Sequence, residues 1–218
     1  MLNKIVLDHY PAVRNPDGPA FNPPLQRFRA LPVHGVILWE CPWIIDPRGA
    51  LTELWREDCV LRSDTDGRKV EQAYISLTRP NTVKGWHLHS TSNGDCGADA
   101  QKDRFVVLSG RIRLGFVDLR GYNGKATAAV GNACHPTRYT QTTGFPSAEV
   151  ELDSSLGCWR VDIPPGVAHG WIALGSEDAR VLNLVSHSYD GQQERRCDPH
   201  GPVAPGLPPW DWRASRDG

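Results

Sequence analysis

Short segments of alternating residue types, separated by turns, constrain the fold of this chain more than any other feature of its sequence. In the segment 71–78, polar and apolar residues alternate, as in a β-strand. Glycine (21 residues) and proline (18 residues) form about 18% of the 218 residues, against roughly 12% in average proteins. No long segment repeats apolar residues at the i, i+3, i+4 and i+7 spacing of a helix. The sequence therefore predicts an all-β protein.

Strands are expected along most of the chain, and turn signals such as D-P-R-G (46–49) separate them. We expect strands at residues 4–7, 36–45, 50–57, 71–78, 83–89, twice within 104–120, and at 148–152, 157–163 and 179–186. About ten short strands with regular turns indicate a sandwich or jelly roll. We expect a single domain over residues 1–218, with a proline-rich N-terminal arm (1–34), a jelly-roll core (36–186) and a C-terminal extension (187–218).

The composition argues against several classes of partner. The formal net charge is −1, so no basic excess supports binding to nucleic acid. No apolar run approaches the roughly 18 residues of a membrane-spanning helix, so we expect no membrane partner. The N-terminus shows no signal peptide, which predicts a cytoplasmic protein. The six cysteines lack a C-x-x-C spacing, which predicts free thiols and neither a zinc ribbon nor a disulfide framework.

Two histidines at spacing two mark a candidate site. They lie in V-K-G-W-H-L-H (83–89), where His87 and His89 share one face if the segment is a strand. A third histidine, His169, lies in P-P-G-V-A-H-G-W (164–171), and Asp103 lies between the two motifs. Three histidines and a carboxylate on separate strands form either an acid/base site or a metal site. The residues alone leave both alternatives open.

The order of these motifs resembles that of the cupins. The pattern G-x-H-x-H, then D-x6-G, then P-x-G-x-x-H begins here at Gly85, Asp103 and Pro164. The resemblance implies an all-β cupin fold, a double-stranded β-helix or jelly roll, here with extended N- and C-terminal segments. It also implies that the site's side chains lie on adjacent strands and face the interior of the barrel.

Within the cupins, the chain more closely resembles the dTDP-4-dehydrorhamnose 3,5-epimerase family, as a divergent member. The matching segments are D-P-R-G-A-L-T-E-L-W (46–55), Q-A-Y-I-S (72–76), K-G-W-H (84–87), V-V-L-S-G-R-I (106–112), V-D-L-R (117–120) and I-P-P-G-V-A-H-G-W (163–171). A C-terminal C-D-P (197–199) followed by P-W-D-W is also similar to the family's ending. The resemblance covers residues 36–212.

The resemblance implies an epimerase or isomerase that acts on a nucleotide-linked 4-keto-6-deoxy sugar. In this family a histidine oriented by an aspartate removes a proton beside the ketone, a tyrosine on the other face returns one, and a basic residue stabilises the enolate. The matching residues are His87 as the base, Asp198 as its aspartate, Lys84 near the enolate or phosphate, and His169 in the A-H-G motif. Such acid/base work needs groups that titrate near neutral pH.

The resemblance also implies a sugar-nucleotide site and an assembly. Arg48 and Gln72 match residues that line the site, and Arg104 and Trp171 are further candidates for substrate binding. The resemblance implies no cofactor. We expect a homodimer, by resemblance and because the N-terminal arm has too little apolar content to stand alone.

Three departures from the family pattern change the expected chemistry. Asn183 falls where the family has its tyrosine, and an asparagine cannot donate a proton as an acid at neutral pH. His89 replaces the family's glutamine, and Asp103 replaces its enolate-stabilising lysine. We therefore expect one epimerised centre, or a related isomerisation, and not double epimerisation.

The same departures create a set of possible ligands for a divalent metal, namely His87, His89, Asp103 and His169. A metal-dependent cupin enzyme is therefore an alternative hypothesis. Thirteen residues separate His89 from Asp103, more than metal-binding cupins usually have, so a long hairpin loop would have to restore the pairing. A third hypothesis is a non-catalytic sugar-binding or regulatory cupin.

Overall fold

Every regular element that the computed structural model describes is a β-strand. The described residues are 3–5, 13–14, 27–55, 69–90, 100–120, 145–204 and 206–213. The strands are β1 (Asn3–Ile5), β2 (Val13–Arg14), β3 (Arg27–Ala30), β4 (Ile37–Cys41), β5 (Ile44–Asp46), β6 (Gly49–Leu51), β7 (Gln72–Thr78), β8 (Val83–His89), β9 (Asp103–Ser109), β10 (Arg111–Asp118), β11 (Ser147–Asp153), β12 (Cys158–Ile163), β13 (Val167–Leu174), β14 (Ala179–Val185) and β15 (Glu194–Arg196). No helix among these residues could cross a membrane.

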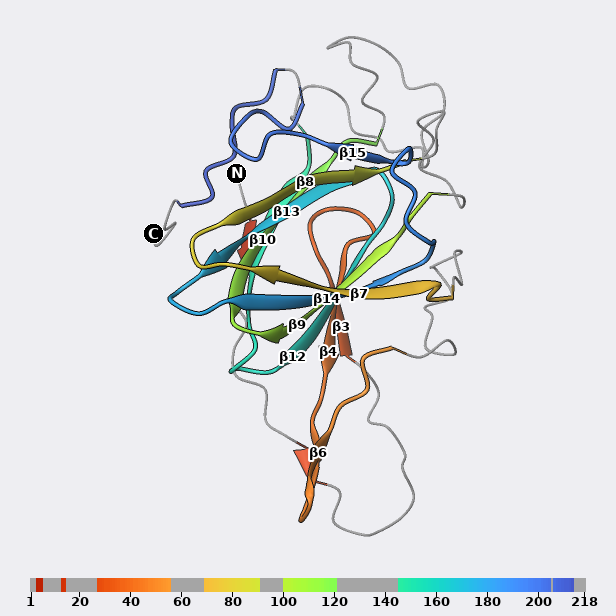
Figure 1. Cartoon of the computed structure of the whole chain (residues 1–218), viewed down its shortest axis with the longest axis vertical. Coiled ribbons are helices and arrows are strands. Elements are labelled where there is room, and N and C mark those ends of the chain that lie inside the picture. Colours follow the sequence, from red (N-terminus) through yellow and green to blue (C-terminus); the bar gives the residue numbers. More distant parts are fainter. Residues whose placement is uncertain are drawn as a thin grey trace.

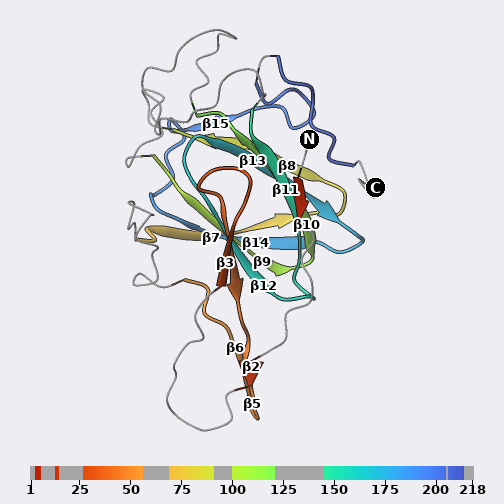
Figure 2. The same cartoon turned by 180° about the vertical axis from the view of Figure 1, so that it is seen from behind.

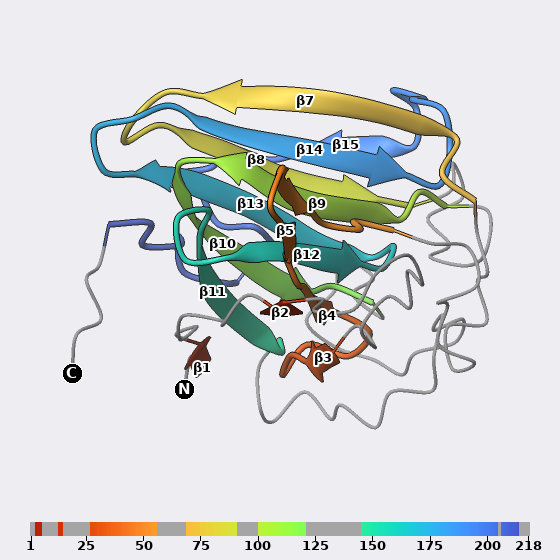
Figure 3. The same ribbon diagram turned by 90° about the horizontal axis from the view of Figure 1, so that it is seen from below.

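Two six-stranded sheets form the body of the protein (Figure 1 and Figure 3). The β8 sheet has the strand order β1-β11-β10-β13-β8-β15, and the β7 sheet has the order β3-β4-β12-β9-β14-β7. Neighbouring strands are antiparallel in both sheets, except for the parallel pair β1 and β11. This is the all-β cupin jelly roll that the sequence predicted.

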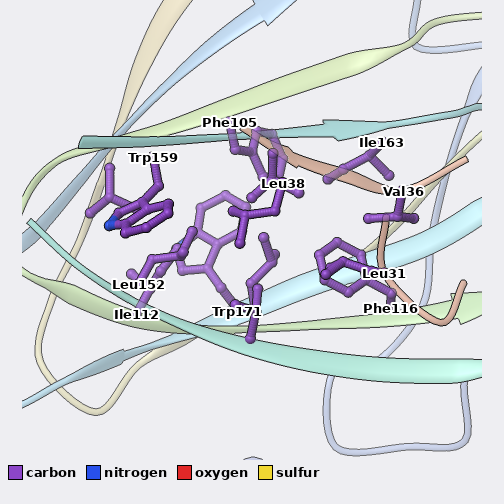
Figure 4. Close-up of a cluster of buried hydrophobic side chains, with 14 of the residues drawn as sticks. Leu31, Val36, Leu38, Phe105, Ile112, Phe116, Leu152, Trp159, Ile163 and Trp171 are labelled. Carbon is purple, nitrogen blue, oxygen red and sulfur yellow. The ribbon is translucent and has the colours of Figure 1, made fainter. Parts of the chain in front are cut away.

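The hydrophobic core lies between the inner faces of the two sheets (Figure 4). In β10, alternate residues point inward, and Ile112, Leu114 and Phe116 are fully buried. The β7 sheet contributes Phe105 from β9 and Ile163 from β12 to the same cluster. Each fully buried side chain of this size stabilises the fold by about 1.5–3 kcal/mol, so this cluster fixes the two sheets against each other.

The C-terminal extension covers the outer face of the β8 sheet. Trp86 of β8 is fully buried there, with ring centroids 5.3 Å from Trp210 and 4.9 Å from Trp212. The indole of Trp212 donates a hydrogen bond to the Pro199 carbonyl over 2.7 Å. Because Trp86 points outward into this cluster, the neighbouring side chain of His87 points inward, between the sheets.

A third, smaller sheet extends away from the body, with the order β2-β5-β6 (Figure 1 and Figure 2). Strands β5 and β6 form a hairpin around the D-P-R-G turn. In that turn the Asp46 carboxylate accepts hydrogen bonds from the backbone and from the guanidinium of Arg48, over 2.8 and 2.6 Å. The turn is therefore closed by its own residues.

Most predicted strands form, with some corrections. The segment 36–45 is interrupted at Pro42, which has no N–H for the sheet ladder, so β4 ends at Cys41 and β5 begins at Ile44. Strand β6 ends at Leu51, before the predicted end of 50–57. Strands β2, β3, β13 and β15 were not predicted. The N-terminal arm (1–34) lies largely outside the described residues.

Strand β7 alternates as predicted, but its apolar side faces outward. Ile75 and Leu77 are 58% and 45% exposed, whereas Gln72, Tyr74 and Ser76 face inward. The reason is that the space between the sheets at this end is a polar cavity and not hydrophobic core.

Candidate functional site

A cavity of about 570 Å³ opens between the two sheets, where β7 and β8 face each other. Volumes of about 300–1,000 Å³ are usual for small-molecule sites. Its lining residues come from β7, β8, β9, β13, β14, β15 and the segment between the last two strands: Gln72, Tyr74, Ser76, Val83, Lys84, Gly85, His87, His89, Asp103, Phe105, His169, Trp171, Val181, Asn183, Tyr189, Glu194 and Arg196. Polar and ionisable groups predominate among them, so this is a site suited to a polar ligand.

A β-bulge in β8 brings a lysine and two histidines onto one wall of this cavity. Strand β13 pairs with β8 at His87 and again at Lys84, and these positions are three residues apart on β8 but two apart on β13. In a regular strand these two side chains would point to opposite faces, but the extra residue turns both toward the cavity. Gly85 permits the bulge, since its φ is +147° and a Cβ there would lie 2.7 Å from the Gly170 Cα.

His87 is held as a proton acceptor. Its Nδ1 donates a hydrogen bond to the Glu194 carboxylate over 2.6 Å, which leaves the lone pair of the neutral ring on Nε2. Burial tends to raise the pKa of Glu194, but its contacts with His87 and Arg196 outweigh burial and lower that pKa to about 2. Glu194 is therefore negatively charged at neutral pH and fixes the tautomer of His87.

Asp103 lies at the centre of a buried polar cluster and is 1% exposed. Its Oδ2 lies 3.0 Å from His89 Nε2 and 3.1 Å from His169 Nε2. Its Oδ1 accepts hydrogen bonds from the amides of Gln101 and Asn183, both over 2.8 Å. Burial tends to raise the pKa of Asp103, but the two histidines outweigh it and hold that pKa well below its usual range. The carboxylate is therefore charged and fully surrounded.

The two histidines that contact Asp103 differ in their protonation. Burial opposes a charge on His89, but the attraction of Asp103 outweighs it and raises the pKa of His89. His169 is different, because its Nδ1 donates to the Val167 carbonyl over 3.0 Å, so the lone pair of the neutral ring is on Nε2 and faces the carboxylate. Burial lowers the pKa of His169. A proton or another cation must lie between this lone pair and Asp103 for the contact to be stable.

A tyrosine and an asparagine form the opposite wall. Tyr74 in β7 and Asn183 in β14 are direct cross-strand partners. The Asn183 amide donates to the Tyr74 hydroxyl over 2.9 Å and to Asp103, and its carbonyl oxygen accepts from the Arg104 backbone N–H over 3.0 Å. These bonds fix the orientation of the Asn183 amide. Burial, with the charge of Asp103, raises the pKa of Tyr74 to about 12.

A cation and an aromatic ring complete the site. Lys84 Nζ donates to Ser76 Oγ over 2.5 Å across the cavity, and burial lowers the pKa of Lys84. The Trp171 ring is stacked near His87, with centroids 6.5 Å apart, and its indole donates to Thr78 over 3.1 Å. The cavity thus combines a base, a cation, a hydroxyl group and a flat apolar surface.

Comparison with known proteins places this site in a family context. No family model matches the chain. It is 29% identical over 160 residues, 72% of this chain and 81% of the other, to the probable low-salt glycan biosynthesis epimerase of Haloferax volcanii. The fold is similar to the dTDP-4-dehydrorhamnose 3,5-epimerases of Elizabethkingia anophelis (TM-score 0.61, 20% identity, 88% of each chain) and Sulfolobus tokodaii (TM-score 0.57, 26% identity, 79% of this chain and 81% of the other). The chain is thus similar in fold to dTDP-4-dehydrorhamnose 3,5-epimerases and distantly similar in sequence to a glycan biosynthesis epimerase. The comparisons indicate a sugar epimerase of this type.

Most residues that the epimerase resemblance selected line this one cavity. They are Gln72, Lys84, His87, His169, Trp171 and Asn183, together with the departures His89 and Asp103. The contact between His89 and Asp103 crosses from the β8 sheet to the β7 sheet, which explains how two residues with thirteen others between them meet.

The structure corrects the prediction that Asp198 orients His87, because the carboxylate that contacts His87 is Glu194. Asp198 lies in a surface turn, where it accepts a hydrogen bond from the backbone of His200 over 2.9 Å. We therefore assign the orienting role to Glu194.

Two arginines that were predicted to bind the substrate do not line the cavity of their own chain. The side chain of Arg104 lies on the outer face of the β7 sheet, 5.7 Å from the Trp55 ring, because neighbours of Asp103 in a strand point to the opposite face. Arg48 lies in the exposed β5–β6 turn, paired with Asp46 at 2.6 Å.

Of the four predicted metal ligands, three lie close together in the structure. Ligand atoms of His89, Asp103 and His169 lie within 4.8 Å of one another. His87 is not part of this group.

Two functional candidates were missed from the sequence. Glu194 lies in a strand of three residues, too short for alternation to be recognised. Tyr74 lies two residues after Gln72, in a segment already matched to the family, so the spacing of a strand could have identified it as a cavity residue.

Proposed function

We propose that the chain is a cytoplasmic epimerase or isomerase of a nucleotide-activated 4-keto-6-deoxy sugar. The main observation is the His87–Glu194 pair, in which a carboxylate 2.6 Å from Nδ1 leaves Nε2 as a base in a ligand-sized cavity. The names of its relatives support this function, since they describe a glycan biosynthesis epimerase and dTDP-4-dehydrorhamnose 3,5-epimerases.

In the proposed reaction, His87 Nε2 removes the proton from the carbon beside the ketone, and Glu194 stabilises the imidazolium that forms. The Lys84 ammonium group, on the same wall, stabilises the enolate oxygen or binds a phosphate of the nucleotide. A positioned base of this kind accelerates proton transfer by roughly 10²–10⁴-fold. Because Asn183 stands at the family's tyrosine position, we propose one epimerised centre.

The test is proton exchange with solvent. The purified chain is incubated in D₂O with a dTDP-4-keto-6-deoxyhexose, and deuterium at the carbons beside the ketone is followed by NMR. We expect enzyme-dependent exchange that falls by at least about 100-fold in His87→Gln. His200→Gln, in the exposed turn after Asp198, is the matched control and should exchange as the wild type does.

A wild type that exchanges no deuterium would overturn the proposal. If the same sugar nucleotide then raised the melting temperature without turnover, the chain would be a non-catalytic sugar-binding cupin.

We propose a metal-dependent cupin enzyme as the second candidate, because the His169 lone pair faces Asp103 Oδ2 at 3.1 Å. The donor set of His89, Asp103 and His169, two imidazoles and one carboxylate, fits a first-row divalent metal. A metal bound there would act as a Lewis acid toward a substrate oxygen. The hydrogen bond from His169 Nδ1 to the Val167 carbonyl would fix the ligand ring, as is usual around metals.

Elemental analysis after metal-replete expression tests this candidate. We expect about one equivalent of metal if the candidate is right, lost in His89→Ala and retained in His87→Ala, whose ring is outside the three-residue set. Less than about a tenth of an equivalent in the wild type would exclude it.

We also propose a homodimer, as the resemblance implies. Ile75, Leu77 and Leu108 on the outer face of the β7 sheet are 58%, 45% and 43% exposed, and contact with a second copy would cover them. Light scattering should give twice the chain mass of 24.1 kDa.

A further inference from the structure

The two walls of the cavity present proton-transfer groups from opposite sides. His87 belongs to the β8 sheet and Tyr74 to the β7 sheet. Both line the same cavity, and the Lys84–Ser76 hydrogen bond of 2.5 Å joins the strands on which they lie. A planar enolate bound between these strands would therefore have an imidazole on one face and a phenol on the other.

The Tyr74 hydroxyl has its proton available for the cavity. It accepts a hydrogen bond from the Asn183 amide over 2.9 Å, and an amide N–H can only donate. No acceptor for the hydroxyl proton is found among the residues that the structure describes. The Tyr74 side chain is also accessible, with 42% of the residue exposed. The proton is thus free to point toward a bound ligand.

The surroundings of Tyr74 keep it protonated and also stabilise its anion. Burial and the charge of Asp103 raise the pKa of Tyr74 to about 12, so the phenol is neutral at pH 7. The hydrogen bond from Asn183 opposes that rise, because it stabilises the phenolate. Asn183, which cannot itself donate a proton as an acid, therefore acts as a positioning residue for one that can.

We propose that Tyr74 is the catalytic acid that protonates the enolate on the face opposite His87, an inference that rests on the proposed function. His87 first takes the proton, and the electron pair of the broken C–H bond forms the enolate. That electron pair then forms a new C–H bond with the Tyr74 proton on the opposite face, and the ketone is restored. Tyr74 is left as a phenolate and His87 as an imidazolium, and exchange of one proton each with water restores both.

This assignment separates two events that one NMR experiment can follow. Proton removal and return by His87 on one face gives deuterium exchange without inversion, whereas inversion requires Tyr74. With a dTDP-4-keto-6-deoxyhexose in D₂O, we expect Tyr74→Phe to retain deuterium exchange within about threefold of the wild type. Formation of the epimer should fall by about 100-fold or more, the usual effect of losing a general acid.

Tyr189→Phe is the matched comparison, since it removes the hydroxyl of the other described tyrosine that lines the cavity. Loss of epimer in Tyr189→Phe, with normal epimer formation in Tyr74→Phe, would overturn the assignment, as would equal loss of exchange and epimer in Tyr74→Phe. A wild type that exchanges no deuterium would overturn the proposed function and this role together. A wild type that exchanges normally, with both readouts unchanged in Tyr74→Phe, would overturn only the role of Tyr74.

Discussion

The two walls of the cavity hold their charges in different ways. On the β8 wall, Glu194 binds His87 and Arg196, and the His87 imidazole is 23% exposed. On the β7 wall, Asp103 is 1% exposed and bound by two amides as well as two histidines. Only the His87–Glu194 pair leaves a nitrogen lone pair accessible to a ligand.

This difference predicts which side chains serve proton transfer and which serve the stability of the fold. A charge that is buried and bonded on all sides stabilises one arrangement of its neighbours, and removing it leaves those neighbours without partners. A pair at the edge of a cavity can gain and lose a proton without rearrangement. We therefore expect variants of the buried Asp103 cluster to affect mainly stability and variants of the His87–Glu194 pair to affect mainly activity.

Asp103→Asn should lower the stability of the protein more than any change to the His87–Glu194 pair. It removes the charge that both His89 and His169 contact, at a side chain that is 1% exposed. Breaking a buried ion pair from one side lowers the free energy of unfolding by about 3 kcal/mol. Urea denaturation measures this loss. Glu194→Gln should lower the free energy of unfolding by less, because the His87 imidazole is 23% exposed and water screens its charge. Equal losses in the two variants would contradict the comparison.

Glu194→Gln should reduce deuterium exchange by about 100-fold, because an amide no longer stabilises the His87 imidazolium. Asp198→Asn is the matched control. It alters the carboxylate that the sequence favoured for this role, but that carboxylate accepts its hydrogen bond in a surface turn. We expect its exchange rate to stay within about twofold of the wild type. A rate loss in Asp198→Asn alone would restore the sequence-based assignment.

The fold could be predicted because its signal is local. Alternation identifies strands such as β7 and β8 without knowledge of their neighbours, and the order of the histidine motifs then selects the cupin arrangement. The same local signal does not say which face of β7 is buried. Ile75 is exposed and Tyr74 faces the cavity because a polar cavity replaces the core there, and this depends on β8, β9 and β14.

The candidate site could be predicted only in part. The pair His87 and His89 follows from their spacing of two. The shared orientation of Lys84 depends on the bulge at Gly85, which the pairing with β13 reveals and the sequence pattern does not. Glu194 replaces Asp198 as the orienting group because three residues of β15 pair with β8, and so short a strand has no recognisable periodicity.

The wild-type protein should lose stability at low pH through protonation of Glu194, and Glu194→Gln should lack this loss. The pKa of Glu194 is about 2 in the folded protein and 4.5 for the free group, so the unfolded chain binds this proton first as the pH falls. The contribution is complete above pH 4.5 and is lost progressively toward pH 2. The urea midpoint should therefore fall more from pH 5 to pH 3 in the wild type than in Glu194→Gln. An equal fall in both proteins would mean that the contact with His87 does not lower the pKa of Glu194.

Arg48→Ala should have the smallest effect on stability. Its guanidinium is 90% exposed and pairs only locally with Asp46, so the free energy of unfolding should change by less than about 0.5 kcal/mol. The same variant also tests where the site ends. Arg48 does not line the cavity of its own chain, so a raised KM with unchanged stability would mean that the β5–β6 hairpin reaches the cavity of a second copy. Unchanged KM and stability would mean that Arg48 takes no part in binding the substrate.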